Sequence, residues 1–147
     1  MKSLFIENDR RNLSQRLDGL NAESKPQWGK MDCPQMLAHI ADGIRMALGE
    51  LPVKAKGGPL RFPPLRYAII YWLPFPKGAP TAPELLARRA SDCHRETAEL
   101  KELMERCAAS TGSAEWAEHP AFGQLSERDW GALMYKHIDH HLRQFGV

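Results

Sequence analysis

The sequence lacks an apolar run long enough to cross a membrane, and it lacks any long block of charge of one sign. The apolar start of the chain turns polar at Glu7, too early for a secretory signal or a membrane span. Its 20 basic and 18 acidic residues are mixed along the chain and give a net charge of +2. We therefore expect a cytoplasmic protein with neither a nucleic-acid partner nor a membrane partner.

Cysteine is also scarce. The chain has three cysteines, Cys33, Cys93 and Cys107, and none of them belongs to a C-x-x-C pair. An odd number without such pairs argues against a disulfide framework and against a thiolate zinc site. We therefore expect reduced cysteines that pack as small apolar side chains.

Alternation of apolar and polar residues, the mark of paired strands, is absent as well. With 147 residues, 43% of them apolar, the chain is long enough to bury one core, so we expect a single domain spanning residues 1–147. Four segments instead carry apolar residues at helical spacing: 8–20, 32–48, 84–109 and 126–146. The sequence therefore predicts an all-α protein, specifically a four-helix bundle.

Capping residues predict where two of these helices begin. Asp32 precedes the second helix and is followed three residues later by Gln35, and Ser126 precedes the last helix and is followed by Asp129. This spacing is typical of a capping box, in which the side chains satisfy free backbone amides of the first turn. Gly49 is placed to end the second helix.

A capping pattern also precedes the third helix. Thr81 and Glu84 bracket Pro83, which predicts a helix from residue 84 to about 109, with a break near Ser91 as an alternative to one continuous helix.

A long crossover rich in proline and glycine joins the second and third helices. Residues 51–83 hold most of the chain's eleven prolines, which excludes a long regular helix there. An apolar island at residues 65–73 predicts one short helix, with a buried strand as the alternative. We expect this crossover to cover one end of the core.

The last predicted helix carries two histidines on its apolar face. One stripe with steps of three and four residues contains Trp130, Met134, His137, His141 and Phe145. Because Cβ atoms four residues apart lie about 5–6 Å from each other on a helix, both imidazoles can reach one metal ion. Two histidines at this spacing also arise by chance in a chain with six. Their position on the core face is therefore the stronger argument for a metal, because buried ring nitrogens need partners. His140 lies one step round the helix, facing the bundle's edge.

His39 is the candidate for a third ligand. It lies midway along the second predicted helix, beside Gly43, and a bundle brings such facing positions together. For a lone histidine, a hydrogen-bonded place at the edge of the core is the more common role.

Four stretches of the chain carry a resemblance to a known family: WGKMDCPQMLAH at 28–39, LPFPKGAPTAP at 73–83, HPAFG at 119–123 and WGALMYKHIDHHLRQF at 130–145. They resemble the DinB/YfiT-like superfamily, specifically its DinB-like branch of unknown function. That superfamily has one histidine in an early helix and an H-x-x-H-H or H-x-x-x-H element in the last helix of a four-helix bundle that binds zinc or nickel. The resemblance implies that His39, His137 and His141 are the metal ligands and that His140 is the extra histidine of the motif.

The resemblance also implies partners. Some relatives are transferases that act on low-molecular-weight thiols, which indicates a small-molecule substrate such as a thiol, and relatives often form homodimers. Imidazole binds Zn²⁺ and Ni²⁺, and cobalt and iron as well, so three histidine ligands do not identify the metal.

Three neutral histidines leave at least one coordination position for water or a thiolate, as in catalytic zinc sites. The first hypothesis is therefore a metal-dependent hydrolase or thiol transferase, in which the metal lowers the pKa of bound water to about 7. His140 or His119 could serve as the catalytic base. Asp42 and Asp139 lie off the stripe, where they are solvated or orient a ligand.

Two alternatives compete with an enzyme. The protein could be a binding or sensing module in which the metal is a structural or effector ion, or the histidines could simply pack without a metal. Catalysis predicts an opening over the metal, lined by apolar groups from residues 52–83, whereas a structural ion predicts a closed site.

Overall fold

The computed structural model describes residues 1–147, and its regular structure is entirely helical. The α-helices are α1 (Glu7–Leu17), α2 (Cys33–Ala47), α3 (Pro63–Tyr67), α4 (Cys93–Ala109) and α5 (Glu127–Gln144). Two 3-10 helices, Pro59–Arg61 and Pro83–Leu86, and a π-helix, Ala68–Trp72, complete the set. The all-α prediction is confirmed, with five α-helices of which α3 is very short.

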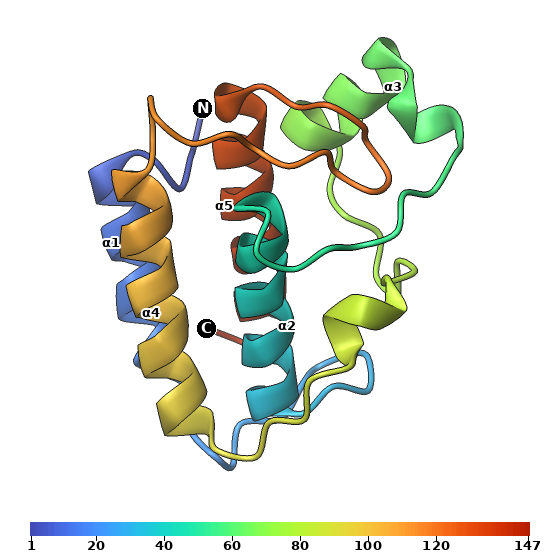
Figure 1. Ribbon diagram of the computed structural model, residues 1–147. Coiled ribbons are helices and arrows are strands. Elements are labelled where there is room, and N and C mark those ends of the chain that lie inside the picture. Colours follow the sequence, from blue (N-terminus) through green and yellow to red (C-terminus); the bar gives the residue numbers. More distant parts are fainter.

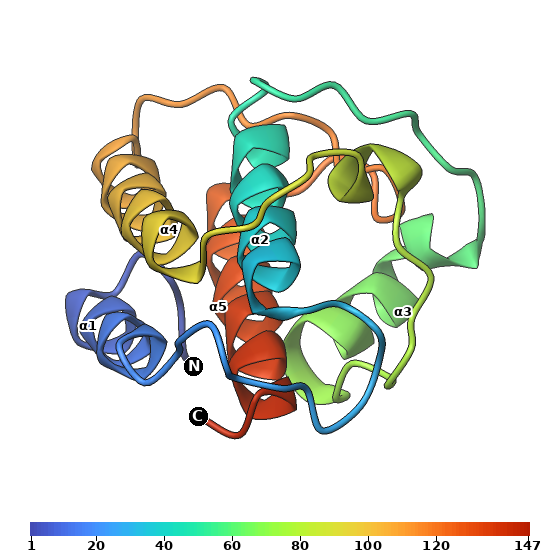
Figure 2. The same cartoon turned by 90° about the horizontal axis from the view of Figure 1, so that it is seen from below.

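The four longer helices lie alongside one another, and the crossover packs against one side of them (Figure 1). Seen along the helices, α2 and α5 lie in the middle, with α1 and α4 on one side and α3 on the other (Figure 2). The crossover therefore covers a side of the α2–α5 pair. The expectation that it covers one end of the core is wrong. This arrangement places the 3-10 helix Pro83–Leu86 against α2 and the π-helix against α5.

Local capping fixes the starts of α2 and α5 as the sequence predicts. The Asp32 carboxylate accepts a hydrogen bond from the backbone amide of Gln35 at 2.9 Å. Ser126 and Asp129 form a reciprocal capping box at the start of α5. These bonds satisfy amides that the first turn of a helix leaves free.

The predicted helix at 84–109 is wrong in its first part. Residues 83–86 form only a 3-10 turn, and α4 begins at Cys93, where Asp92 accepts from the amide of Arg95. The break expected near Ser91 is therefore present. The physical cause is tertiary, because Arg88 leaves the helical path to form ion pairs with buried carboxylates on α2 and α4.

The apolar island forms a helix, as predicted, and the strand alternative is wrong. It begins at Pro63, two residues before the predicted start, and its second half has π-helical hydrogen bonding. Ile70 is buried on the inner face, whereas Trp72 is 77% exposed. The last helix ends at Gln144, two residues before the predicted end.

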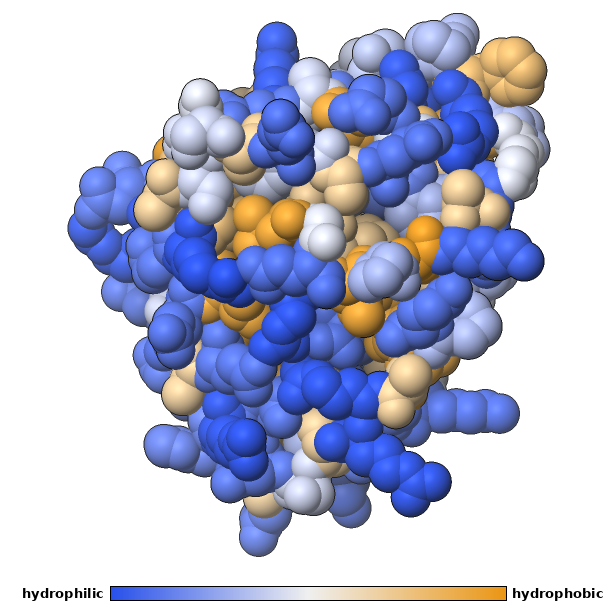
Figure 3. Space-filling view, viewed as in Figure 1, coloured by the Kyte–Doolittle hydropathy of each residue, from blue (hydrophilic) through white to orange (hydrophobic).

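The core joins the inner faces of the four longer helices with parts of the crossover. Trp130, Met36, Leu37 and Leu100 are among its fully buried side chains. Hydrophilic side chains cover most of the face shown in Figure 3, and apolar side chains gather toward its centre. No helix combines the length and hydropathy that a membrane crossing requires.

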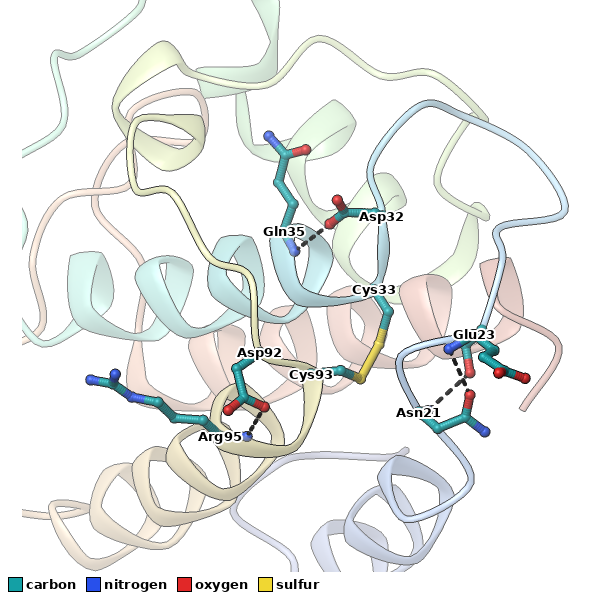
Figure 4. The surroundings of a disulfide bond; sticks show 9 residues. Asn21, Glu23, Asp32, Cys33, Gln35, Asp92, Cys93 and Arg95 are labelled. Carbon is teal, nitrogen blue, oxygen red and sulfur yellow. Dashed lines mark hydrogen bonds between the residues drawn. A yellow bond between two sulfur atoms is a disulfide. The ribbon is translucent and has the colours of Figure 1, made fainter.

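The expectation of reduced cysteines is wrong for two of the three. Cys33 and Cys93 form a disulfide between the first residues of α2 and α4, with their Cα atoms 6.0 Å apart (Figure 4). They are 60 residues apart in the sequence, so only the packing of these two helices brings them together. Cys107 is free and buried, and burial raises the pKa of its thiol to about 12.

Candidate metal centre

The structure brings His39 of α2 together with His137 and His141 of α5. The Nε2 atom of His137 lies 3.0 Å from Nε2 of His39 and 3.1 Å from Nε2 of His141. Two nitrogens bound to one tetrahedral zinc ion, each at about 2.0–2.1 Å, would lie about 3.3 Å apart. The three nitrogens therefore converge with a spacing close to that of a metal-bound set, and this group could hold a metal ion.

The crossover fixes the protonation of His39. Its Nδ1 lies 3.2 Å from the carbonyl oxygen of Leu85, in the 3-10 turn. A carbonyl oxygen only accepts hydrogen bonds, so Nδ1 carries the proton and donates it. A neutral His39 then presents an unprotonated Nε2, with its lone pair toward the other two histidines.

Gln144 has the same effect on His141. The amide nitrogen of Gln144 donates to the carbonyl oxygen of Trp28 at 2.6 Å, which turns its amide oxygen toward His141. That oxygen lies 2.7 Å from Nδ1 of His141, and because it only accepts, Nδ1 carries the proton. The Nε2 lone pair of His141 therefore also points into the cluster.

Two lone pairs thus face the single Nε2 of His137. A proton on that nitrogen can be donated fully to only one of them, so a cluster without a cation leaves at least one buried acceptor poorly satisfied. A divalent cation would accept all three lone pairs at once. The Nδ1 protons of His39 and His141 would keep their acceptors, the carbonyl oxygen of Leu85 and the amide oxygen of Gln144. This donor arrangement is typical of metal-binding histidines, whose other nitrogen donates to a carbonyl or a carboxylate.

The surroundings keep these histidines neutral. Burial, then the proximity of His141 and His39, holds the pKa of His137 well below its ordinary value of 6.5. Burial and His39 lower the pKa of His141 to about 3, although its bond with Gln144 opposes the shift. Burial also lowers the pKa of His39, against the opposing effects of Leu85 and Asp42. Neutral imidazole is the form that binds metals.

The site is closed around two histidines and more open at the third. His39 and His141 are 4% and 7% exposed, whereas His137 is only partly buried. Gly43 of α2 faces the His137 ring, because a Cβ atom at that position would lie 3.7 Å from it. The ring of Phe75, from the crossover, lies 6.3 Å from that of His137. An apolar group from residues 52–83 therefore borders the site.

A separate groove of about 1180 Å³ lies between the π-helix, the first residues of the chain and α5. Its α5 residues are Ala132, Tyr135, Lys136 and Asp139 among others. The groove does not include the three histidines, so it is distinct from the candidate metal centre.

An ion-pair network holds the crossover beside His39. Arg88 lies 2.8 Å from a carboxylate oxygen of Glu96 on α4 and 3.3 Å from one of Asp42 on α2. Both carboxylates are buried, and Arg45 makes a further pair with Asp42 at 2.6 Å. Arg88 is three residues from Leu85, so the network anchors the turn whose carbonyl accepts from His39.

The remaining predicted site residues have different surroundings. His140 is partly buried, and its ring lies 5.9 Å from each of the Trp28 and Phe75 rings. Asp139, next to His140 on α5, pairs with Arg16 at 2.7 Å and with Arg143 at 2.9 Å. Asp42 is not solvated but buried in the network around Arg88.

His119 holds its own loop together. Its Nδ1 accepts hydrogen bonds from the backbone amides of Ala121 and Phe122, each at 3.1 Å. Its ring packs 4.6 Å from that of Phe122 and 5.4 Å from that of Trp130. Burial lowers its pKa to about 4. A catalytic role for His119 would have to use its other nitrogen.

Sequence reasoning missed three residues that orient the ligands. Gln144 could have been found, because it lies three residues after His141 on the same helix and therefore beside it. Leu85 and Arg88 gave no signal, since one acts through its backbone carbonyl and the other belonged to a segment predicted as helix surface.

The sequence profile of one protein family matches residues 2–146, and its description is "protein of unknown function (DUF1569)". No curated protein and no solved structure matches the chain significantly.

Proposed function

The chain belongs to the DUF1569 family, and from the histidine cluster we propose that it holds one divalent metal ion with His39, His137 and His141. The observation that carries the proposal is the paired orientation of His39 and His141. The oxygens of Leu85 and Gln144 accept hydrogen bonds from the Nδ1–H groups of these rings, which leaves both Nε2 atoms directed at His137. Core packing without a ligand would not be expected to direct two buried acceptors at the one Nε2 atom of His137.

We further propose that the protein is an enzyme, either a hydrolase or a thiol transferase. A metal held by three histidines would supply a Lewis acid with a coordination position free for water or a thiolate. The partial exposure of His137 and the nearby Phe75 are the features that favour access by a small molecule. His140, at the more open side, is the proposed base, and His119 is a second candidate.

The finer fold and the cofactor are proposals as well. We propose that the four longer helices form a DinB/YfiT-like four-helix bundle, with the histidines on the second and last of them. The resemblance favours zinc or nickel as the metal, a low-molecular-weight thiol as one class of substrate, and a homodimer as the assembly. We propose the cytoplasm as the compartment.

The alternative is a binding or sensing module in which the metal does not turn over a substrate. Two of the three histidines are nearly closed to solvent, and the nearby carboxylates Asp42 and Asp139 are held in ion pairs. A site with few free acid or base groups suits a structural or effector ion.

Elemental analysis of untagged protein tests the proposal. Wild type should carry close to one equivalent of metal, and His137→Ala and His141→Ala should lose it. His94→Ala is the matched control, because His94 is exposed and outside the cluster. Absence of metal in wild type, or its retention in both site variants, would refute the proposal. For metal-loaded protein, thiol-transfer and hydrolase substrates then distinguish the enzyme from the binding module.

A further inference from the structure

The open side of the histidine cluster has an aromatic rim. Phe75 of the crossover lies with its ring 6.3 Å from that of His137 and 5.9 Å from that of His140. Trp28, from the segment between α1 and α2, also lies beside His140, with its ring 5.9 Å away. Both aromatic side chains are only partly buried. They therefore lie beside the least buried histidine of the cluster and its neighbour His140.

A lysine completes this rim. The Nζ atom of Lys77 lies 4.3 Å from the centre of the Trp28 ring, in a cation–π arrangement. Lys77 is exposed and forms none of the ion pairs of the structure. Trp28 therefore holds the ammonium group beside the rim without neutralising its charge.

The carboxylates nearest to the histidines are already paired. Asp139 is held by Arg16 and Arg143, and Asp42 by Arg45 and Arg88. The crossover at residues 51–83 contains no aspartate or glutamate, whereas its basic residues are Lys54, Lys56, Arg61, Arg66 and Lys77. Residues 51–83, which provide Phe75 and Lys77, therefore carry only basic charges of their own, although Glu84 follows directly and Glu118 pairs with Arg61. A bound divalent cation would add further positive charge.

From this rim we propose the class of molecule that the site accepts: a small organic anion with a flat apolar body, which contacts Phe75 and Trp28 while its negative group pairs with Lys77. The inference rests on the proposed metal site and names its substrate class. Apolar walls with one or two placed charges are the usual make-up of a small-molecule site. The basic crossover would also raise the local concentration of anions and speed their arrival.

Benzoate and benzamide are suitable probes, because they have the same ring and nearly the same shape but differ in charge. Full-length protein loaded with Co²⁺ is titrated with each compound by calorimetry, and the visible absorption of the Co²⁺ site is followed in parallel. Lys77→Met removes the charge and keeps most of the side-chain volume. Lys101→Met is the matched control, because Lys101 lies on α4, on the side of the α2–α5 pair away from the crossover.

Benzoate should bind more tightly than benzamide, and Lys77→Met should weaken benzoate roughly fivefold, the effect of a favourable exposed ion pair. The same variant should leave benzamide unchanged, and Lys101→Met should change neither. Equal affinities for the two probes in wild type would overturn the proposal. So would a benzoate preference that Lys77→Met does not reduce, since the carboxylate would then be recognised by the metal alone.

The two proposals can fail separately. Lack of a Co²⁺ absorption signal in wild type would contradict the metal site, and the calorimetric comparison on the same protein would still decide the preference for anions. A normal Co²⁺ signal with no charge preference would contradict only the substrate class.

Discussion

The carbonyl oxygen of Leu85 lies 3.2 Å from Nδ1 of His39 and so joins the crossover to the candidate metal centre. This contact determines which nitrogen of His39 faces the other two histidines. The turn that provides it is fixed by Arg88, whose guanidinium group contacts Asp42 and Glu96. An ion pair outside the cluster therefore supports the contact that orients His39, one of the three candidate ligands.

Replacing Arg88 should weaken metal binding although Arg88 does not touch the cluster. We expect Arg88→Met to release the turn around Leu85 and to lower the affinity for zinc about 10–100-fold, as is usual for groups that orient a ligand. Arg88→Lys, which keeps the charge but not the paired hydrogen bonds, should have an intermediate effect. The measurement is a zinc titration against a competing chelator.

The titration has to be carried out where every variant is folded, as judged by circular dichroism. Arg106→Met is the control, because Arg106 pairs with Glu50 at 2.6 Å on the exposed surface. Unchanged zinc affinity in folded Arg88→Met would show that the turn does not orient His39.

Gln144 should be equally important for His141. In Gln144→Leu the Nδ1 atom of His141 loses its acceptor and the carbonyl of Trp28 loses its donor. We expect zinc affinity to fall about tenfold or more and the stability of the metal-free protein to fall by about 1–3 kcal/mol. Gln15→Leu, on the exposed surface of α1, is the control. Thermal melting and the zinc titration give the two values, and a variant with wild-type affinity would contradict the role of Gln144.

The metal-free protein should lose stability as the pH falls below about 6.5. A histidine whose pKa is lowered in the folded state takes up its proton first in the unfolded state. Unfolding is therefore favoured from the unfolded pKa downward, and the penalty is complete below the folded pKa. For His119 this interval runs from 6.5 to about 4. His39, His137 and His141 act in the same direction.

Melting temperatures between pH 7.5 and 4.5, measured with a chelator present, test this expectation. His119→Gln should be less stable than wild type at pH 7.5, because the Gln amide oxygen lies one bond further from the backbone than Nδ1 and is poorly placed for the two backbone amides. Its decline with pH should be shallower. The contribution of His119 is up to about 3 kcal/mol before solvent screening is considered. His94→Gln should follow wild type, and parallel slopes for all three proteins would rule out a contribution from His119.

Reduction of the Cys33–Cys93 disulfide should lower the free energy of unfolding, and the helices should still unfold together in one transition. The bond spans 60 residues, for which the chain-entropy model gives about 4 kcal/mol. Denaturant unfolding with and without a reductant measures the difference. The double variant Cys33→Ser/Cys93→Ser should match the reduced wild type and should not respond to reductant. A wild-type curve that reductant leaves unchanged would contradict the bond.

The sequence by itself determined the local structure of this protein. Helical spacing and the caps at Asp32 and Ser126 depend only on residues within one or two turns, so α2 and α5 began where they were predicted. The apolar stripe of α5 turned His141 inward for the same reason. The all-α class and the candidates His137 and His141 followed from these local patterns, whereas the family resemblance made His39 the third candidate.

Tertiary structure alone decided the features that depend on distant parts of the chain. Cys33 pairs with Cys93, and Leu85 contacts His39, although no local sequence pattern indicates either contact. The late start of α4 likewise depends on contacts with distant residues. A backbone carbonyl has no residue type by which a pattern could identify it. The protonation of His39 is therefore set by the packing of the crossover, whereas its place on the inner face of α2 is set by helical periodicity.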